Sequence, residues 1–321
     1  MIKPRVGVMR GGLGGEYYVS LRTGAAVLAS LPRDRYEVHD ILITHVGEWH
    51  IDGVPTIPAK LSQHVDVIFN ALHGEFGEDG KVQKILDIFN IPYTGSTALP
   101  SAVGMNKDLA KKTFAAVGSM VPEGIVVERG EEIHDVVSRI QNKISAPYVV
   151  KPLNGGSSIG LSFALTIPEL ITGIETALAY NHKAIVEEYI RGREITIGVI
   201  DSVNGKSAYA TPSIEILLPE GKLFDYNQKY KNIDHPIGPA RLHTHERHAI
   251  EEIALRTHFQ LAARHYARYD FILSEKGPYL LEVNTLPGLT KTSLITKSLA
   301  LHDIPFSKFI DYIITLALHR K

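Results

Sequence analysis

The chain has 321 residues, 44 % of them hydrophobic and 21 % charged, which is enough to bury a large core in two or three domains. Its 34 Lys and Arg nearly balance its 35 Asp and Glu, and the formal net charge is −1. The sequence holds no basic block, so we expect no nucleic-acid partner. Because it holds no cysteine, disulfides, thiolate catalysis and cysteine metal sites are excluded.

Nothing in the sequence suggests export or membrane insertion. Residues 1–15 contain only a short apolar stretch before glycines appear, whereas a secretory signal needs about 7–15 apolar residues and a cleavage site. No apolar run approaches the roughly 18 residues of a spanning helix. We therefore expect a cytoplasmic protein that does not bind membranes.

The N-terminal third has the pattern of a Rossmann-like domain, which we expect over residues 1–103. A short apolar run is followed by the glycine-rich turn at 11–15 and by helical apolar spacing. The alternation of apolar runs with amphipathic stretches predicts βαβ units and a mostly parallel sheet. Strands are predicted at 5–9, 37–43 and 65–70, and helices at 17–31 and 81–90.

Two mixed units follow, a central one expected over residues 104–188 and a C-terminal one over 189–321. A polar stretch of about 20 residues at 219–240 is longer than most connections, which favours a mobile lid. Helices are predicted at 107–117 and 131–142 and within 246–265 and 292–318. Strands are predicted at 123–128, 148–150 and 185–190, and β-rich segments at 194–200, 206–216 and 279–283.

Three oxygen donors near the C-terminus point to a metal site. Glu282 and Asn284 are two apart on an apolar strand, so both face one side, and Asp270 can join them from a neighbouring strand. Carboxylate and amide oxygens suit Mg²⁺, which also takes waters and substrate phosphates as ligands. The alternative is solvated surface acids, but acids within Val/Leu strands would be costly to bury without a counter-charge.

A second group of residues suits a polyphosphate. Lys107 and Lys151 offer two charges, and the glycine-rich segment 154–160 offers backbone N–H groups. Each feature alone is more often a solvated lysine or a plain turn. The spacing of a Walker loop is absent, and the glycines near the N-terminus give no full dinucleotide fingerprint.

The histidines are weaker signals. His243, His245 and His248 lie in a polar stretch, and we do not expect them to bind a transition metal. His73 follows the apolar run at 65–72, at the end of a predicted strand, where ligands bind in open α/β sheets.

Taken in order, these elements resemble the D-alanine–D-alanine ligase family over essentially the whole chain. The resemblance rests on the motifs GGLGGEYYVSL at 11–21, ALHGEFGEDG at 71–80, PYTGS at 92–96, MNK at 105–107, VVKPLNGGSSIG at 149–160, VEEYIRGRE at 186–194, KY at 229–230, RYDF at 268–271 and LEVNTLPGLTKTSL at 281–294. Chance agreement over nine ordered motifs is negligible.

The resemblance implies a three-domain ATP-grasp fold of α/β and α+β type, with an N-terminal Rossmann-like domain. It also implies an enzyme of peptidoglycan precursor synthesis that joins two D-alanines with ATP, through an acylphosphate that the second amine displaces. ATP and two Mg²⁺ ions, or Mn²⁺ in their place, would be its cofactors. A homodimer is the oligomer that the resemblance implies.

Residue roles carry over from the family by motif. ATP-binding positions would be Lys107, Lys151, Ser157, Ser158, Glu187, Glu188, Ile190, Glu194 and Lys229, and metal ligands Asp270, Glu282 and Asn284. D-alanine would contact Glu16 through the first ammonium group, with His73 nearby, and Ser293 and Leu294 through the second substrate. Catalytic positions would be Arg268 and the Gly288 amide at the oxyanion, and Glu16, Ser157 and Tyr230 as a hydrogen-bonded trio that closes the lid.

Some positions depart from the family pattern around the amino-acid sites. These are Gly14, Tyr17, Tyr18, Phe76, Lys291 and Thr292. They keep open a second substrate other than D-alanine, such as D-lactate or another D-amino acid, although Lys229-Tyr230 favours dipeptide formation. A biotin-dependent carboxylase subunit shares the fold, but HGEFGEDG argues against it, and a non-enzymatic nucleotide-binding role predicts the loss of a residue among Arg268, Asp270, Glu282 and Asn284.

Overall fold

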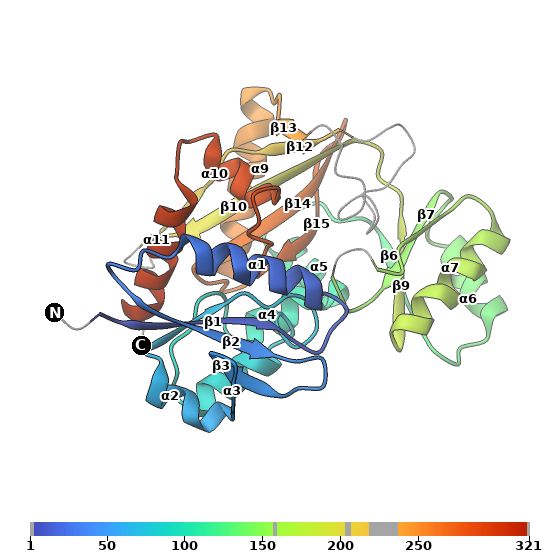
Figure 1. The fold of residues 1–321 in the computed structure, drawn as a ribbon. Helices are drawn as coiled ribbons and strands as arrows, with labels where there is room; N and C mark the ends of the chain where they lie inside the picture. Colours follow the sequence, from blue (N-terminus) through green and yellow to red (C-terminus); the bar gives the residue numbers. More distant parts are fainter. Residues whose placement is uncertain (1–2, 157–158, 203–206, 218–236, 320–321) are drawn as a thin grey trace.

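The computed structural model describes residues 3–156, 159–202, 207–217 and 237–319, arranged around three β-sheets (Figure 1). The first sheet uses strands from the N-terminal part of the chain, the second from the middle and the third from the C-terminal part. Ser157, Ser158, Lys229, Tyr230 and most of the expected lid lie outside the described residues.

The N-terminal sheet has the strand order β4-β3-β2-β1-β5. Its strands are β1 (Arg5–Gly11), β2 (Glu37–Ile43), β3 (Trp49–Ile51), β4 (Val54–Thr56) and β5 (Val67–Asn70). β1 pairs in parallel with β2 and β5, but β2, β3 and β4 pair antiparallel, so the sheet is mixed rather than mostly parallel. Gly11 ends β1 at φ +91°, and a Cβ there would lie 2.1 Å from the Ile43 carbonyl oxygen, so only glycine fits this turn.

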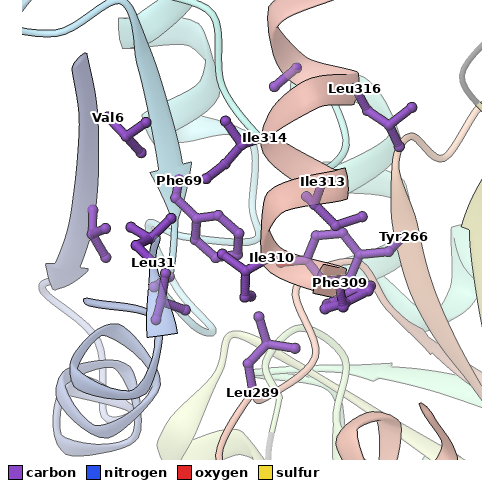
Figure 2. Close-up of a cluster of buried hydrophobic side chains, with 14 of the residues drawn as sticks. Val6, Leu31, Phe69, Tyr266, Leu289, Phe309, Ile310, Ile313, Ile314 and Leu316 are labelled. Carbon is purple, nitrogen blue, oxygen red and sulfur yellow. The ribbon is translucent and has the colours of Figure 1, made fainter. Parts of the chain in front are cut away.

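The C-terminal end of the chain covers the N-terminal sheet. Helix α11 (Phe306–His319) packs against β5 and against α1 (Tyr17–Ser30), which follows the glycine turn. Figure 2 shows Phe69 of β5 beside Ile310 and Ile314 of α11, and Ile313 beside Tyr266, within one buried cluster. Burial of this apolar surface fixes the N-terminal sheet to the C-terminal part of the chain.

Two short helical segments connect β4 to β5 within this sheet, and three helices lead from β5 to the central sheet. They are η1 (Pro58–Lys60), α2 (Leu61–His64), α3 (Lys81–Ile88), α4 (Ala98–Met105) and α5 (Lys107–Ala116). Asn106 caps α5, because its side-chain oxygen accepts the Leu109 N–H at 3.0 Å.

The central sheet has the order β6-β9-β7-β8 and lies in a lobe of its own, in green at the right of Figure 1. Its strands are β6 (Gly124–Glu128), β7 (Tyr148–Pro152), β8 (Ser162–Ala164) and β9 (Lys183–Glu188), with helices α6 (Ile133–Gln141) and α7 (Ile167–Tyr180). The glycine loop runs from β7 to β8, and a capping box of Thr166 and Glu169 starts α7.

The C-terminal sheet has the order β13-β12-β10-β14-β15, with β11 also paired to β10. Its strands are β10 (Arg193–Asp201), β11 (Ala208–Ala210), β12 (Ile214–Ile216), β13 (Ile237–Pro239), β14 (Tyr266–Ser274) and β15 (Gly277–Asn284), with helices α9 (Thr244–Gln260) and α10 (Leu294–Ala300). Its apolar core includes Phe114 of α5 and Ile250 of α9.

Most predicted elements are confirmed. The β-rich segment predicted at 206–216 contains two strands, β11 and β12, and the helical segment predicted at 292–318 contains two helices, α10 and α11. Pro212 and Pro305 lie in the two interruptions, where the missing backbone N–H and the fixed φ oppose continuation. Among the described residues, no helix is long and apolar enough to cross a membrane.

Candidate active site

A cavity of about 530 Å³ opens between the central sheet and the C-terminal sheet. Residues of β7, β9, β10, β14 and β15 line it, together with the described part of the glycine loop. Its size suits a small organic ligand or nucleotide.

The cavity gathers the predicted nucleotide residues that the structure describes. Lining positions include Lys107, Lys151, Glu187, Glu188, Ile190 and Glu194, and also Asp270 and Glu282 of the predicted metal set. These positions come from segments more than 150 residues apart in the chain, so chain folding brings them to one place.

A buried group of three charges lies at one wall of the cavity, where Lys151 and Glu187 line it and Lys111 contacts Glu187. The Glu187 side chain is 3 % exposed, and its two carboxylate oxygens lie 2.6 Å from Lys111 Nζ and 2.6 Å from Lys151 Nζ. Although burial opposes it, the two lysines hold the pKa of Glu187 below its usual value, whereas burial lowers the pKa of Lys111. The Glu187 carboxylate is thus the counter-ion of two lysines, which its sequence assignment beside the adenine and ribose did not include.

Lys111 was missed in the sequence. It stands four residues after Lys107 on α5, so the two lysines share a helix face, and this spacing was an available signal. Gly124 of β6 makes room for it, because a Cβ at this glycine would lie 2.8 Å from Lys111 Nζ.

Asp270 and Glu282 line the cavity from β14 and β15, and Arg268 and Asn284 lie beside them on the same sheet face. The register places Asp270 opposite Glu282, and Arg268 opposite Asn284. Arg268 donates to both Asp270 oxygens, from Nε at 2.9 Å and from Nη2 at 2.8 Å. The Asn284 amide nitrogen donates to Asp270 at 3.0 Å. The three predicted oxygen donors, Asp270, Glu282 and Asn284, therefore lie on one sheet face.

The chemistry of these donors fits Mg²⁺. Asp270 and Glu282 are carboxylates on the cavity wall, and since Asn284 uses its amide nitrogen on Asp270, its oxygen is the atom that remains for a cation. Within the described ranges, no group of three or more His, Asp or Glu side chains is placed to hold a metal ion.

Glu16 connects the N-terminal part to the glycine loop. Its side chain is 8 % exposed and lies against two glycines, since a Cβ would come within 2.1 Å of Glu16 Oε2 at Gly74 and within 2.9 Å at Gly156. Gly156 also lines the cavity. The carboxylate predicted to bind an ammonium group therefore lies next to the loop predicted to cover phosphates, while Ser157 and Tyr230 of the same trio are not described.

His73 is buried and neutral. Its Nδ1 lies 2.9 Å from the Leu286 carbonyl oxygen, which can only accept, so Nδ1 carries the proton. Nε2 then accepts from the Thr23 hydroxyl at 2.7 Å. Burial lowers the pKa of His73 to about 4.

Glu78, in the same motif as His73, was also missed. It accepts the Gly74 N–H and the Leu286 N–H, each at 2.9 Å. Burial and the nearby Glu16 carboxylate raise the pKa of Glu78 to about 7. The acidic residues of the motif HGEFGEDG mark Glu78 as a candidate site residue, but they do not indicate its hydrogen bond to Leu286, 208 residues away.

The loop from Leu286 to Leu294 holds the remaining predicted positions. A Cβ at Gly288 would lie 3.1 Å from Ser293 Oγ, so these two residues are adjacent. Ser293 Oγ accepts the Thr290 N–H at 2.9 Å just before α10 begins. The Leu294 side chain packs against Ile214 and Ile216 in a small core cluster, so any polar contact with substrate would come from its backbone.

Of the departures from the family pattern, Phe76 has a clear structural setting. It adopts φ +72°, a conformation that glycine enters without cost and other residues rarely adopt. Its buried ring packs edge-on against Trp49 with centroids 6.4 Å apart, which offsets the backbone cost. Tyr17 stacks on His45 at a centroid distance of 3.5 Å.

Family models match two parts of the chain. The model "D-ala D-ala ligase C-terminus" matches residues 114–315, and "D-ala D-ala ligase N-terminus" matches residues 53–96. Among individual sequences, the chain is 38 % identical over 318 residues to D-alanine–D-alanine ligase B of Clostridium perfringens, covering 99 % of each. It is 38 % identical over 320 residues to D-alanine–D-alanine ligase of Geobacter sulfurreducens, covering 98 % of this chain and 94 % of that one.

Solved structures agree with this similarity. The D-alanine–D-alanine ligase from Bacillus anthracis complexed with ATP has a TM-score of 0.81 and 30 % identity, with 98 % of this chain and 97 % of that one covered. The VanG D-Ala:D-Ser ligase from Enterococcus faecalis has a TM-score of 0.86 and 28 % identity, with 98 % of this chain and 100 % of that one covered. The three-sheet arrangement is that of the ATP-grasp ligases.

Proposed function

The chain belongs to the D-alanine–D-alanine ligase family, and from this premise we propose that it joins two D-alanines, with ATP, into D-alanyl-D-alanine for peptidoglycan precursors. The observation that carries the proposal is the cavity between the central and C-terminal sheets. One wall presents Lys107 and Lys151, and another presents Asp270 and Glu282, with Arg268 bonded to Asp270. Gly156 also lines the cavity and lies against Glu16. Such a site can hold a polyphosphate beside an amino acid.

ATP occupies this cavity in our proposal. Lys107 and Lys151 contact its phosphates, and Glu187, Glu188, Ile190 and Glu194 surround the adenine and ribose. Ser157, Ser158 and Lys229 are assigned to the nucleotide by family resemblance alone, because they lie outside the described residues. Both lysines line the cavity, which supports the first assignment, as does the ATP complex of the Bacillus anthracis relative.

Asp270, Glu282 and Asn284 hold two Mg²⁺ ions in the proposed site, or Mn²⁺ in their place. When bound, the ions supply positive charge that offsets the charge developing on the transferred phosphoryl group. The side-chain oxygens of Asp270, Glu282 and Asn284 lie on one sheet face and are ligands that Mg²⁺ prefers, which supports this assignment.

The proposed amino-acid sites lie next to the glycine loop, where Glu16 contacts Gly156. Glu16 binds the ammonium group of the first D-alanine, with His73 behind it, and Ser293 and Leu294 contact the second D-alanine. The carboxylate of the first D-alanine attacks the γ-phosphorus, which yields ADP and an acylphosphate. The amine of the second D-alanine then attacks the acyl carbon, loses a proton and displaces phosphate. Arg268 and the Gly288 N–H stabilise the oxyanion of that step, an effect worth about 2.7–4 kcal/mol per donor.

Further parts of the proposal rest on the family resemblance. The chain divides into domains at 1–103, 104–188 and 189–321, with a lid at about 219–240, and Glu16, Ser157 and Tyr230 close over the site and exclude water from the acylphosphate. The enzyme is a cytoplasmic homodimer that binds neither nucleic acid nor membrane.

The test is phosphate release by the full chain with ATP and D-alanine, with and without Mg²⁺, and with products identified by mass. Parallel reactions contain L-alanine, D-alanine with D-lactate, or D-alanine with D-serine, the last because of the similarity to a D-Ala:D-Ser ligase. We expect Mg²⁺-dependent release with one dipeptide per phosphate from D-alanine alone. Product only with another acceptor would overturn the substrate assignment, and release independent of any D-amino acid would overturn the ligase proposal.

A further inference from the structure

The peptide unit around Leu286 is held from both sides by one motif of the N-terminal part of the chain. Glu78 Oε1 accepts the Leu286 N–H at 2.9 Å, and His73 Nδ1–H donates to the Leu286 carbonyl oxygen at 2.9 Å. The Leu286 side chain is 2 % exposed. Both hydrogen-bonding groups of this residue are therefore satisfied by side chains more than 200 residues earlier in the sequence.

The same carboxylate also fixes the other side of the amino-acid site. Its second oxygen, Oε2, accepts the Gly74 N–H at 2.9 Å, and Gly74 is the residue against which the Glu16 carboxylate lies. Glu78 thus links two backbone segments through hydrogen bonds, one at Gly74 beside Glu16 and one at Leu286, two residues before Gly288. The first position is the proposed ammonium site and the second leads into the proposed oxyanion donor.

We propose that Glu78 is a positioning residue that sets the distance between the Glu16 ammonium site and the Gly288 loop, with His73 as its partner on the Leu286 carbonyl. The inference rests on the proposed function, because it assigns Glu78 a role in that reaction. Glu78 does not touch the reacting atoms in this assignment. It acts through two backbone amides, and both must be held for the acyl carbon to lie within reach of the amine and the oxyanion donor.

A carboxylate is required because both contacts are N–H donors. Glutamine offers one acceptor oxygen, and its NH₂ group would face the second N–H, so Glu78→Gln loses one of the two hydrogen bonds and adds a repulsive contact. Since a buried N–H left without a partner is costly, we expect kcat/KM for D-alanine to fall by about tenfold to a hundredfold.

The matched control is Glu75→Gln in the same loop. The Glu75 side chain is 70 % exposed and pairs with Lys81, away from the site, so this variant should behave as wild type. The dissociation constant for ADP, measured by calorimetry, should stay within about twofold of wild type in both variants. A structural defect would instead weaken nucleotide binding along with D-alanine turnover, and that result would overturn the positioning role.

Amide hydrogen exchange tests the geometry without turnover. In the full chain, Glu78→Gln should speed exchange of the Leu286 amide by about tenfold or more, and Glu75→Gln should not. Should Glu78→Gln fail to fold, Glu78→Asp keeps both acceptor oxygens on a shorter stem and should show the same effect in part. Unchanged exchange and unchanged D-alanine kinetics would overturn the inference, whereas a wild-type chain that makes no dipeptide would overturn the proposed function.

Discussion

Lys111→Met is the perturbation that most directly tests the buried charge group in the cavity wall. Methionine keeps the length and apolar stem of lysine, so packing against Gly124 is largely preserved while one of the two 2.6 Å contacts to Glu187 is lost. Breaking a buried ion pair outright costs about 3–5 kcal/mol when a charge is left unpaired. Glu187 keeps Lys151, and the variant no longer pays for burying the lysine charge, so we expect a smaller loss of about 1.5 kcal/mol, as for one charged hydrogen bond.

The same change should weaken nucleotide binding. Two lysines and one glutamate give this wall a charge of +1, and removing Lys111 reduces it to zero. Glu187 would then interact with Lys151 alone and compete with the phosphates for it. We expect the dissociation constant for ATP to rise about tenfold, or about 1.4 kcal/mol, with the D-alanine KM little changed.

Lys112→Met provides the matched control for this experiment. Its side chain is 70 % exposed and pairs with Asp108 one turn away on the same helix, a type of pair that contributes little to stability. Thermal unfolding and ADP calorimetry would be run on both variants and on Glu187→Gln, which leaves two buried lysines without their carboxylate and should be the least stable. If Lys111→Met matched Lys112→Met in both measurements, the charge-group argument would be refuted.

Two further perturbations address the amino-acid end of the site. The variant Gly74→Ala places a Cβ 2.1 Å from the Glu16 carboxylate at φ +63°, and should raise the D-alanine KM in steady-state kinetics about tenfold or more. The control Gly118→Ala, at φ +81° with open space around it, should leave this KM unchanged. His73 has a folded pKa of about 4 against 6.5 when unfolded, so the unfolded chain binds a proton first and stability falls as pH drops below 6.5. The variant His73→Asn lacks this pH-dependent loss. Its deficit in the free energy of unfolding relative to wild type, measured with urea, should therefore shrink by about 2 kcal/mol between about pH 7.5 and about pH 5. A deficit that stays constant with pH would contradict the neutral, buried imidazole.

The elements that sequence reasoning located are those with a local cause. The glycine turn after β1, the apolar spacing of α1 and the capped start of α5 are each encoded within a few residues, and each is present. The hairpin of β3 and β4 was missed, although Asp52-Gly53 is a strong hairpin signal. Both residues have positive φ, +50° and +82°, as a two-residue turn of this kind requires. Its strands have only three residues each, too few for a periodicity to register.

The site was predictable where strand alternation settles which side a residue faces. Glu282 and Asn284 were placed on one face from their spacing, and the register confirms that Asp270 and Arg268 lie beside them. Contacts between residues far apart in the sequence were not predictable in this way. Glu187 meets Lys111 from 76 residues away, and Leu286 meets Glu78 from 208 residues away. Such partners depend on how the sheets pack, which periodicity within a segment does not report.

The missed residues share one physical feature, since each satisfies a buried polar group that belongs to a site residue. Lys111 neutralises the carboxylate that also holds Lys151, and Glu78 accepts the N–H groups beside Glu16 and Gly288. A buried polar group without a partner costs about 1–3 kcal/mol, so a functional charge placed in a cavity wall requires a second polar residue behind it. The sequence marks the functional residue by its motif. Its partner looks like an ordinary helix lysine or loop acid in the sequence, and only the folded chain reveals that the site depends on it.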